Sequence, residues 1–312
     1  MTTVKVDSQQ RYHDTSAAYV LPKANDVIEQ DRLDTQAAAI VEMIGGFPIL
    51  APLQTLDDIS KVAEDSVAQL LNVGCGTGVA TIQIATILPS ATIYGLDLTP
   101  VPEESKKMAP GNVVWAQGNA LDVDYNQPDN GVLSREIFKP KGMDYIFGRM
   151  LFLGINNWPK YFSTTSYALR SGGIIEHQDL DWKFYRAGTS ECVSDDWEWH
   201  KAILSGAQKS GLSTVSGSGA AALMRDCGLK VINFQGFEFS FSASSKTPKS
   251  QAMARYVQAK LIPQYPELLR KMLGAIGISG EKLETLTRAC LHDINSEEGL
   301  YQKYTVTIAR KP

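Results

Sequence analysis

The stretch "LLNVGCGTGVATIQI", Leu70 to Ile84, carries the strongest structural signal in the 312-residue sequence. An apolar run typical of a strand leads into glycines at every second position, Gly74, Gly76 and Gly78, and an apolar helical pattern follows. Glycine permits positive φ and lets a ligand approach the backbone closely. A strand, a glycine-rich turn and a helix in this order therefore predict a binding site for a nucleotide-like cofactor.

The residues after the glycines distinguish between cofactor classes. A dinucleotide site needs a third small residue three positions after the second glycine. Counted from Gly74 that position holds Val79, and counted from Gly76 it holds Thr81, so the requirement is not met. No Lys-Ser or Lys-Thr pair follows the glycines, which excludes a phosphate-binding P-loop. Asp97 ends the next predicted strand, where a carboxylate can accept hydrogen bonds from ribose hydroxyls.

Strands and helices alternate from Ala68 onward. Strand patterns such as "ATIYGLDL", "NVVWAQGNA" and "MDYIFGRM" are separated by helical ones, which predicts an α/β fold with a parallel sheet covered on both faces. We expect residues 1–66 to form a helical cap and residues 67–312 to form the main domain. Within that domain, residues 244–298 read as a helical insertion before the last strand, a candidate lid over an apolar acceptor or a homodimer surface.

The composition indicates which binding partners and which cellular compartment to expect. A net charge of -4 gives no electrostatic reason to expect nucleic acid or an anionic membrane surface as a partner. The N-terminus is polar and lacks the apolar core of a signal peptide, and no apolar run approaches the roughly 20 residues of a membrane helix. Four scattered cysteines without zinc-site spacing predict reduced thiols and a cytoplasmic protein: Cys75, Cys192, Cys227 and Cys290.

Three features in sequence order resemble the class I S-adenosylmethionine methyltransferases: the G-x-G-x-G turn, the acid that ends the second strand, and the pair Asn119-Ala120 that ends the third. The segment "YVLPKANDVIEQDRLDTQ", Tyr19 to Gln36, resembles the N-terminal signature of the fungal LaeA-like methyltransferases. "MDYIFGRMLFLGINNWPKYF" and "GGIIEHQDLD" are similar to later motifs of that family. The resemblance implies a Rossmann-like seven-stranded sheet with the last strand antiparallel, S-adenosylmethionine as cofactor, and methyl transfer, often in secondary metabolism.

The resemblance also implies roles for individual residues. The glycine turn would line the methionine and ribose portions of the cofactor, Asp97 would bind the ribose hydroxyls, and Leu98 would pack on adenine. Asn119 and Ala120 would meet the adenine edge, and the pair after the fourth strand would form the floor of the pocket. The expected cofactor-binding residues are Asn72, Gly74, Cys75, Gly76, Gly78, Asp97, Leu98, Asn119, Ala120, Arg149 and Met150.

Methyl transfer is an in-line displacement, so the protein mainly aligns the reacting groups and excludes water. A general base is needed only for a protonated acceptor such as a phenol. The candidate bases are His177 at the end of the fifth strand, His200 on the helix after it, and His13 in the N-terminal segment. Alternation along the strand allows His177 to converge only with Asp179 and Asp181, and we expect no metal there.

The sequence departs from the family pattern at two places. Asn72 stands where the family usually has aspartate, and Gly118-Asn119 replaces an acidic pair. Asparagine can still accept a hydrogen bond, so we expect Asn72→Asp to preserve or tighten cofactor binding. The favoured function is O- or N-methylation of a small, moderately apolar metabolite. The missing carboxylates leave open a non-methylating cyclase on the same fold, or a regulator of secondary metabolism like the family's namesake.

Overall fold

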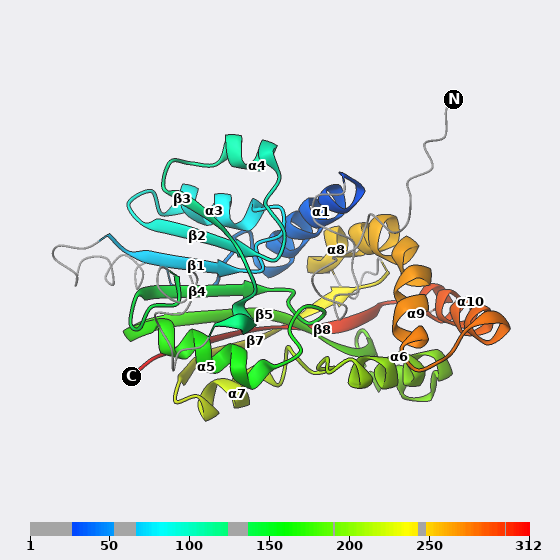
Figure 1. Ribbon diagram of the computed structural model, residues 1–312. Helices are drawn as coiled ribbons and strands as arrows, with labels where there is room; N and C mark the ends of the chain where they lie inside the picture. The colour runs from blue at the N-terminus through cyan, green and yellow to red at the C-terminus, as the bar shows by residue number, and fades with distance from the viewer. Residues whose placement is uncertain (1–26, 53–66, 124–136, 190, 243–247, 297) are drawn as a thin grey trace.

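The computed structural model describes residues 27–52, 67–123, 137–189, 191–242, 248–296 and 298–312. Its strands are β1 Gln69–Val73, β2 Thr92–Asp97, β3 Val113–Gln117, β4 Met143–Arg149, β5 Leu169–Arg186, β6 Glu191–Cys192, β7 Lys230–Ser240 and β8 Leu300–Arg310. They form a single sheet in the order β3-β2-β1-β4-β5-β8-β7, with the short β6 paired to the end of β5 (Figure 1).

The strand directions confirm the expected fold class. β1 pairs in parallel with β2 and β4, β2 with β3, and β4 with β5. The last strand, β8, runs antiparallel to both of its neighbours, β5 and β7. The strand order reverses between β1 and β4, and open α/β sheets bind ligands outside the carboxyl ends of the strands at such a point. The residues that follow these two strands, Gly74 and Met150, therefore stand at the expected ligand site.

Helices cover both faces of the sheet. In chain order they are α1 Val27–Ile44, α3 Val79–Ile87, α4 Glu103–Met108, α5 Trp158–Ala168, α6 Glu198–Lys209, α7 Ala220–Asp226, α8 Gln251–Tyr256, α9 Tyr265–Gly274 and α10 Gly280–Ser296. α1 and α3 pack on one face, and α5 and α7 on the other, while α6, α9 and α10 gather around one end of the sheet (Figure 1). Within the described ranges, no helix is long and apolar enough to cross a membrane.

The expected insertion over residues 244–298 is helical through most of its described part. Its helix α8 packs against α1, and α9 and α10 pack against α6, so the insertion is joined to the rest of the molecule at two places. The expected N-terminal segment with His13 lies outside the described residues. The division into a cap and a main domain, and the homodimer surface, remain predictions.

Replacing Gly206 tests the close packing of α6 on α9. An alanine normally stabilises a helix relative to glycine, but here the new methyl carbon would lie 2.3 Å from Met272 O. We expect Gly206→Ala to lower the free energy of unfolding by about 1–3 kcal/mol in urea denaturation. Gly274→Ala is the matched control, because no atom lies within 4 Å of its Cβ position. Equal stability of the two variants would contradict this packing.

Candidate active site

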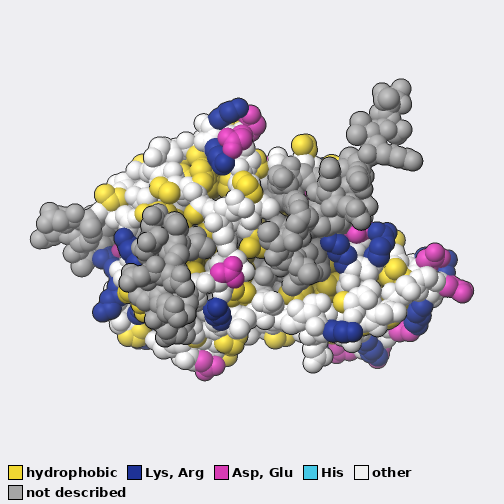
Figure 2. Space-filling view, in the orientation of Figure 1, with side chains coloured by type: hydrophobic (Ala, Val, Ile, Leu, Met, Phe, Trp, Pro, Cys, Tyr) yellow, Lys and Arg dark blue, Asp and Glu magenta, His cyan; other side chains and the backbone are white. Residues whose placement is uncertain are grey.

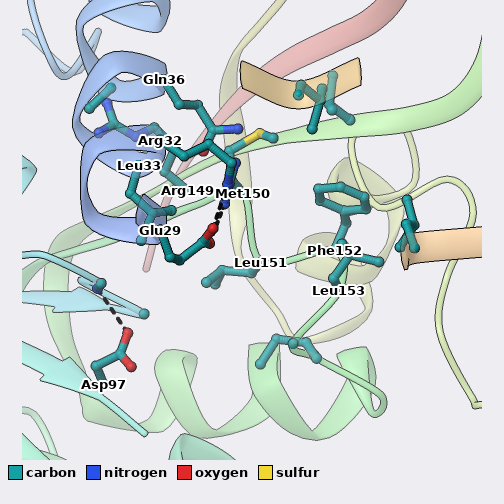
Figure 3. Close-up of a pocket in the computed structure, with 18 of the residues that line it drawn as sticks. Glu29, Arg32, Leu33, Gln36, Asp97, Arg149, Met150, Leu151, Phe152 and Leu153 are labelled. Atoms are coloured by element: carbon teal, nitrogen blue, oxygen red, sulfur yellow. Dashed lines mark hydrogen bonds and ion pairs between the residues drawn. The ribbon is translucent and has the colours of Figure 1, made fainter. Parts of the chain in front are cut away.

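A cavity lies at the carboxyl ends of β1, β2 and β4, where the sheet meets α1, α6 and the insertion (Figure 3). Its volume, taken as the space open to the centre of a water molecule, is about 210 Å³. One half is lined by the glycine turn, the end of β2, the turn after β3, and α1. The other half is lined by the loop after β4, the far part of β5, α6 and the insertion. The cavity thus joins the predicted cofactor turn to a second space.

The glycine turn contributes Gly74, Cys75 and Gly76 to the cavity, as expected. The N–H groups of Gly74 and Cys75 donate to Leu96 O at 2.8 and 3.0 Å, which fixes the turn against β2. Gly76 has a φ of 57°, in the region that favours glycine. Burial, together with the nearby charge of Asp97, raises the pKa of the Cys75 thiol well above its usual range, so the thiol is neutral.

Gly78 does not line the cavity, contrary to its expected role in cofactor binding. Its φ is 85°, and a Cβ at this position would lie 2.6 Å from Trp115 Cη2 and 3.2 Å from Val101 Cγ1. The residue is small because it starts α3 in a left-handed conformation and because the indole ring packs directly over it. The requirement for glycine here comes from packing.

Asn72 is also absent from the cavity lining. The residue is 3% exposed, and its Nδ2 donates to Thr81 Oγ1 at 2.8 Å. Asn72 therefore links β1 to α3 beneath the turn, and its side chain contacts the protein core instead of the ligand space. The substitution Asn72→Asp would place a carboxylate in this buried contact, and its expected effect on cofactor binding stays a prediction.

Asp97 ends β2 and lines the cavity. Its Oδ2 accepts from Gly76 N at 2.8 Å, and its Oδ1 accepts from Thr99 N at 3.0 Å. These bonds fix the carboxylate between the glycine turn and the residues after β2, Leu98 and Thr99, which also line the cavity. Oδ1 also accepts from the Thr99 hydroxyl at 3.1 Å, so its two lone pairs are engaged, whereas Oδ2 keeps one lone pair for a ligand.

The turn after β3 brings Gly118, Asn119 and Ala120 to the same half of the cavity. Asn119 Oδ1 accepts from Leu121 N at 2.9 Å and thereby caps a short 3-10 helix over Ala120–Asp122. This bond holds the Asn119 side chain against the backbone of the turn. The side chain stands where the family pattern has an acid, and its cap explains why an uncharged residue suffices for the local fold.

The residues of α1 that line the cavity were not predicted as site residues. Arg32 is buried among them, with 4% of its surface exposed. Its Nε and Nη2 donate to the two carboxylate oxygens of Glu29 at 2.8 and 2.6 Å, and its Nη1 donates to Tyr256 OH at 2.7 Å (Figure 3). The set on α1 comprises Glu29, Arg32, Leu33, Gln36 and Ala37. Their signal in the sequence is the family-like segment Tyr19 to Gln36, which includes all of them except Ala37.

Both aspartates of that block also make contacts across elements. Asp31 pairs with Lys260 of the insertion. Asp34 Oδ1 accepts from Thr77 Oγ1, in the glycine turn, at 2.6 Å. Successive residues of α1 therefore hold the turn on one side and the insertion on the other. This arrangement gives the family-like block a structural role beside the cavity.

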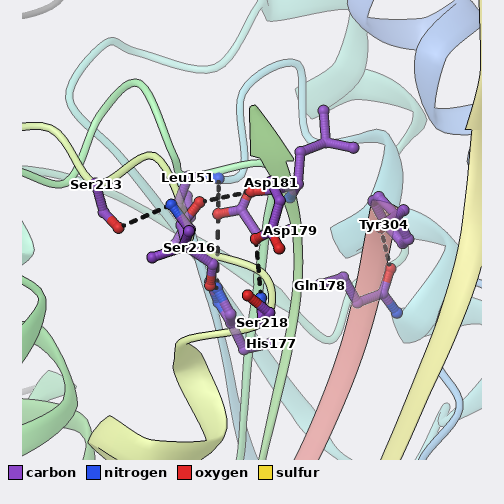
Figure 4. Close-up of polar contacts among 11 residues, drawn as sticks. Leu151, His177, Gln178, Asp179, Asp181, Ser213, Ser216, Ser218 and Tyr304 are labelled. Carbon is purple, nitrogen blue, oxygen red and sulfur yellow. Dashed lines mark hydrogen bonds and ion pairs between the residues drawn. The ribbon is translucent and has the colours of Figure 1, made fainter. Parts of the chain in front are cut away.

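A buried carboxylate positions the loop after β4. Asp179 Oδ2 accepts from Leu151 N at 3.1 Å, and its Oδ1 accepts from Leu180 N at 2.9 Å (Figure 4). Burial raises the pKa of Asp179 well above its usual value. Met150 has a φ of 56° and donates its N–H to Gln178 O at 2.9 Å. These bonds to β5 stabilise a left-handed residue that would otherwise cost about 1–3 kcal/mol.

His177 is fully buried and does not line the cavity. Its ring lies on the α5 side of the sheet, with its centroid 5.1 Å from that of Trp158 and 5.5 Å from that of Phe162. Its Nε2 lies 3.3 Å from Ser216 O (Figure 4). Burial lowers the pKa of His177 to about 4, so the ring is neutral at pH 7. The expectation that this histidine faces the acceptor is therefore not met.

His200 lines the cavity from α6, as expected, although it is only 1% exposed. Its Nε2 lies 2.9 Å from Trp182 O. A carbonyl oxygen can only accept, so Nε2 carries the hydrogen and Nδ1 is the nitrogen able to take up a proton. Burial lowers the pKa of His200, which keeps the ring neutral at pH 7. Among the described residues, no group of three or more His, Cys, Asp or Glu is placed to hold a metal ion.

The second half of the cavity is lined mainly by aromatic and aliphatic side chains. Trp182 packs edge-on against Phe152, with ring centroids 5.7 Å apart. The helical insertion, expected as a lid, contributes three apolar side chains and a glutamine. The apolar members of this half are Phe152, Leu153, Ile155, Leu180, Trp182, Phe184, Trp199, Ile203, Leu261, Tyr265 and Leu268, and the polar ones include Asp181, His200, Gln264 and Gln302. Most were not predicted, because the sequence gives no signal of which helical residues turn toward a distant loop.

Residues 50–233 match the family model described as a methyltransferase domain. The match covers more than half of the chain and includes the glycine turn and Asp97. The chain belongs to the methyltransferase domain family. The donor used by this family is S-adenosylmethionine, as the resemblance implied.

Two curated fungal proteins are similar to this methyltransferase-family chain and confirm the resemblance. Methyltransferase pytC of Aspergillus terreus is 26% identical over 242 residues, which cover 77% of this chain and 66% of that protein. The secondary metabolism regulator laeA of Coprinopsis cinerea is 28% identical over 170 residues, 54% of this chain and 37% of that protein. The chain thus spans only part of the length of both relatives.

A solved structure of Haemonchus contortus phosphoethanolamine N-methyltransferase 2 in complex with S-adenosyl-L-methionine is a more distant likeness. It aligns with a TM-score of 0.43 and 16% identity, covering 94% of this chain and 60% of that chain. Similarity at this level carries no argument about the reaction or the substrate of the present protein.

The lowered pKa of His177 predicts a loss of stability in acid. Between pH 6.5 and 4 the unfolded chain binds a proton at this ring and the folded chain does not, so the free energy of unfolding falls as the pH falls. We expect this contribution to reach about 3 kcal/mol, measured as the difference between the wild type and His177→Gln in urea denaturation at each pH. The exposed His292, replaced by Gln, is the control. Parallel pH profiles for wild type and His177→Gln would contradict the burial.

Proposed function

We propose that the protein binds S-adenosylmethionine in the glycine-turn half of the cavity and methylates an oxygen or nitrogen of a small, moderately apolar metabolite in the other half. The supporting observation is the continuity of the cavity, because Asp97 lines the same space as Phe152 and Trp182. Bound there, the cofactor would supply a methyl group on a positively charged sulfur for in-line transfer. The relatives' names, a methyltransferase and a secondary metabolism regulator, support a secondary metabolite as acceptor.

The residues of the glycine-turn half fit this cofactor. The Asp97 carboxylate is already oriented by Gly76 N and Thr99 N. Its Oδ2 could accept one ribose hydroxyl, and its Oδ1 could accept a second if the Thr99 hydroxyl turned away. A Cβ at Gly76 would have only Leu33 Cδ1 nearby, at 3.6 Å, so the backbone of the turn faces space that a ligand can occupy. Leu98 and Ala120 offer apolar contacts for a planar base.

The second half of the cavity suits an apolar substrate that carries an oxygen able to accept a hydrogen bond. Its aromatic walls exclude water, which strengthens electrostatic interactions at the reacting atoms. Trp182 Nε1 is buried and has no hydrogen-bond partner in the described part of the chain. An unpaired buried donor costs about 1–3 kcal/mol, and an oxygen of the acceptor would satisfy it.

A protonated acceptor such as a phenol would need a base, and we assign this role to His200. It is the one histidine of the described residues that lines the cavity. Its lowered pKa keeps the ring neutral at pH 7, which is the form that can accept a proton. The backbone carbonyls of Trp182 and Ser194, which both interact with the ring, would stabilise its protonated form.

Incubation with methyl-labelled S-adenosylmethionine tests the reaction itself. The purified protein is given a panel of phenols, carboxylic acids and amines with apolar skeletons, and products are followed by label and by mass. We expect a labelled product heavier than its acceptor by one methyl group. Tight binding of S-adenosylhomocysteine without any transfer would contradict methylation, and a rearranged product of unchanged mass would favour a cyclase.

Substituting Asp97 with asparagine tests the cofactor site without an acceptor. The amide would present an NH₂ group where the carboxylate now accepts from backbone N–H groups, and it would lose the charge. We expect the affinity for S-adenosylhomocysteine, measured by calorimetry, to fall at least about 10-fold. Asp196→Asn is the control, because that carboxylate is exposed and lies outside the cavity. Unchanged affinity in Asp97→Asn would remove Asp97 from the site.

A further inference from the structure

Arg149 is a cation that the described protein leaves without an ionic partner. It is the last residue of β4 and lines the cavity. Its Nη1 is buried and donates to no acceptor among the described residues. Its guanidinium carbon lies 5.8 Å from the centroid of the Phe147 ring. Arg149 as a whole is half-buried, but a guanidinium stays charged in proteins, so leaving one of its buried nitrogens without a partner is costly.

The nearby acceptors are already occupied. The Glu176 carboxylate accepts from Leu50 N, Ala51 N, Tyr145 OH and Gln178 Nε2, at distances between 2.6 and 3.1 Å. These donors take up the lone pairs of both carboxylate oxygens. Glu176 therefore attracts Arg149 through its charge without forming an ion pair with it.

Arg32 provides a comparison within the same cavity. All three of its guanidinium nitrogens donate to protein groups, two to Glu29 and one to Tyr256. Of the two arginines that line this space, one is thus satisfied by the protein and the other is not. The difference indicates that Arg149 is available for a group that enters from outside.

The position of Arg149 restricts what that group can be. In Figure 3, Arg149 lies beside the α1 side chains Glu29 and Gln36, whereas Phe152 and Leu153 lie across the cavity. It is therefore on the side of the cofactor half. A guanidinium binds carboxylates in a bidentate manner, and the amino-acid end of S-adenosylmethionine carries one.

We propose that Arg149 binds the carboxylate of the methionine part of the cofactor and selects for ligands that carry this carboxylate. This inference rests on the proposed function. The nucleoside end would be held at Asp97 and the amino-acid end at Arg149, so the sulfur is fixed between two points. An acceptor carboxylate is the other source of the same chemistry, and the experiment separates the two.

The binding of two ligands, compared in the absence of an acceptor substrate, tests this role of Arg149. S-adenosylhomocysteine has the amino-acid end, whereas 5′-methylthioadenosine has the same nucleoside and thioether without it. We expect Arg149→Met to weaken binding of S-adenosylhomocysteine by about 10- to 100-fold in calorimetry, and to change binding of 5′-methylthioadenosine less than about twofold. Arg149→Lys keeps the charge and should retain most of the preference. Arg225→Met, at an exposed position of α7, is the control.

Each other outcome overturns the assignment. An equal loss of affinity for both ligands would mean that Arg149 acts by maintaining the fold. Unchanged affinity for S-adenosylhomocysteine would mean that Arg149 binds an anionic group of the acceptor substrate or binds no anion at all. If Arg149→Met fails to fold, the preference retained by Arg149→Lys decides the question. Wild-type protein that binds neither ligand would contradict the proposed function itself, which is a separate result.

Discussion

The buried ion pair between Glu29 and Arg32 is the interaction on which the shape of the cavity depends. The same guanidinium donates to Tyr256 OH, so one side chain joins α1 to α8 of the insertion. Breaking a buried pair by removing one partner typically costs about 3–5 kcal/mol. With Asp34 bonded to Thr77 in the glycine turn, α1 fixes the turn and the insertion relative to each other. These bonds therefore hold the walls of the cavity between them in place.

The two halves of that space are made from different parts of the chain. The glycine-turn half is built around backbone turns at strand ends, oriented by Asp97 and Leu96. The second half is lined mainly by apolar and aromatic side chains from the loop after β4, the far part of β5, α6 and the insertion. Asp179 positions the loop after β4, which lines the second half, by accepting from Leu151 N. A fixed polar site beside a mainly apolar one suits a transfer in which the protein aligns groups and excludes water.

The fold, the glycine turn and Asp97 could be predicted because their signals are local, in the spacing of glycines and the alternation of strands and helices. The surroundings of Asn72 and His177 could not be predicted because a strand sends successive side chains to opposite faces, and a sequence does not say which face meets the ligand. The role of Gly78 in cofactor binding stays a prediction, because packing under Trp115 demands glycine as strongly as a ligand does. The cavity residues of α1 and the insertion depend on contacts between distant segments, which periodicity cannot locate.

A crystal structure with S-adenosylhomocysteine bound tests the central claim most directly, namely that one continuous cavity holds the donor at one end and leaves an apolar space for the acceptor at the other. The account predicts the ribose hydroxyls on Asp97 and the sulfur facing the space beside Phe152 and Trp182. A ligand bound elsewhere, or a sulfur directed away from that space, would contradict it.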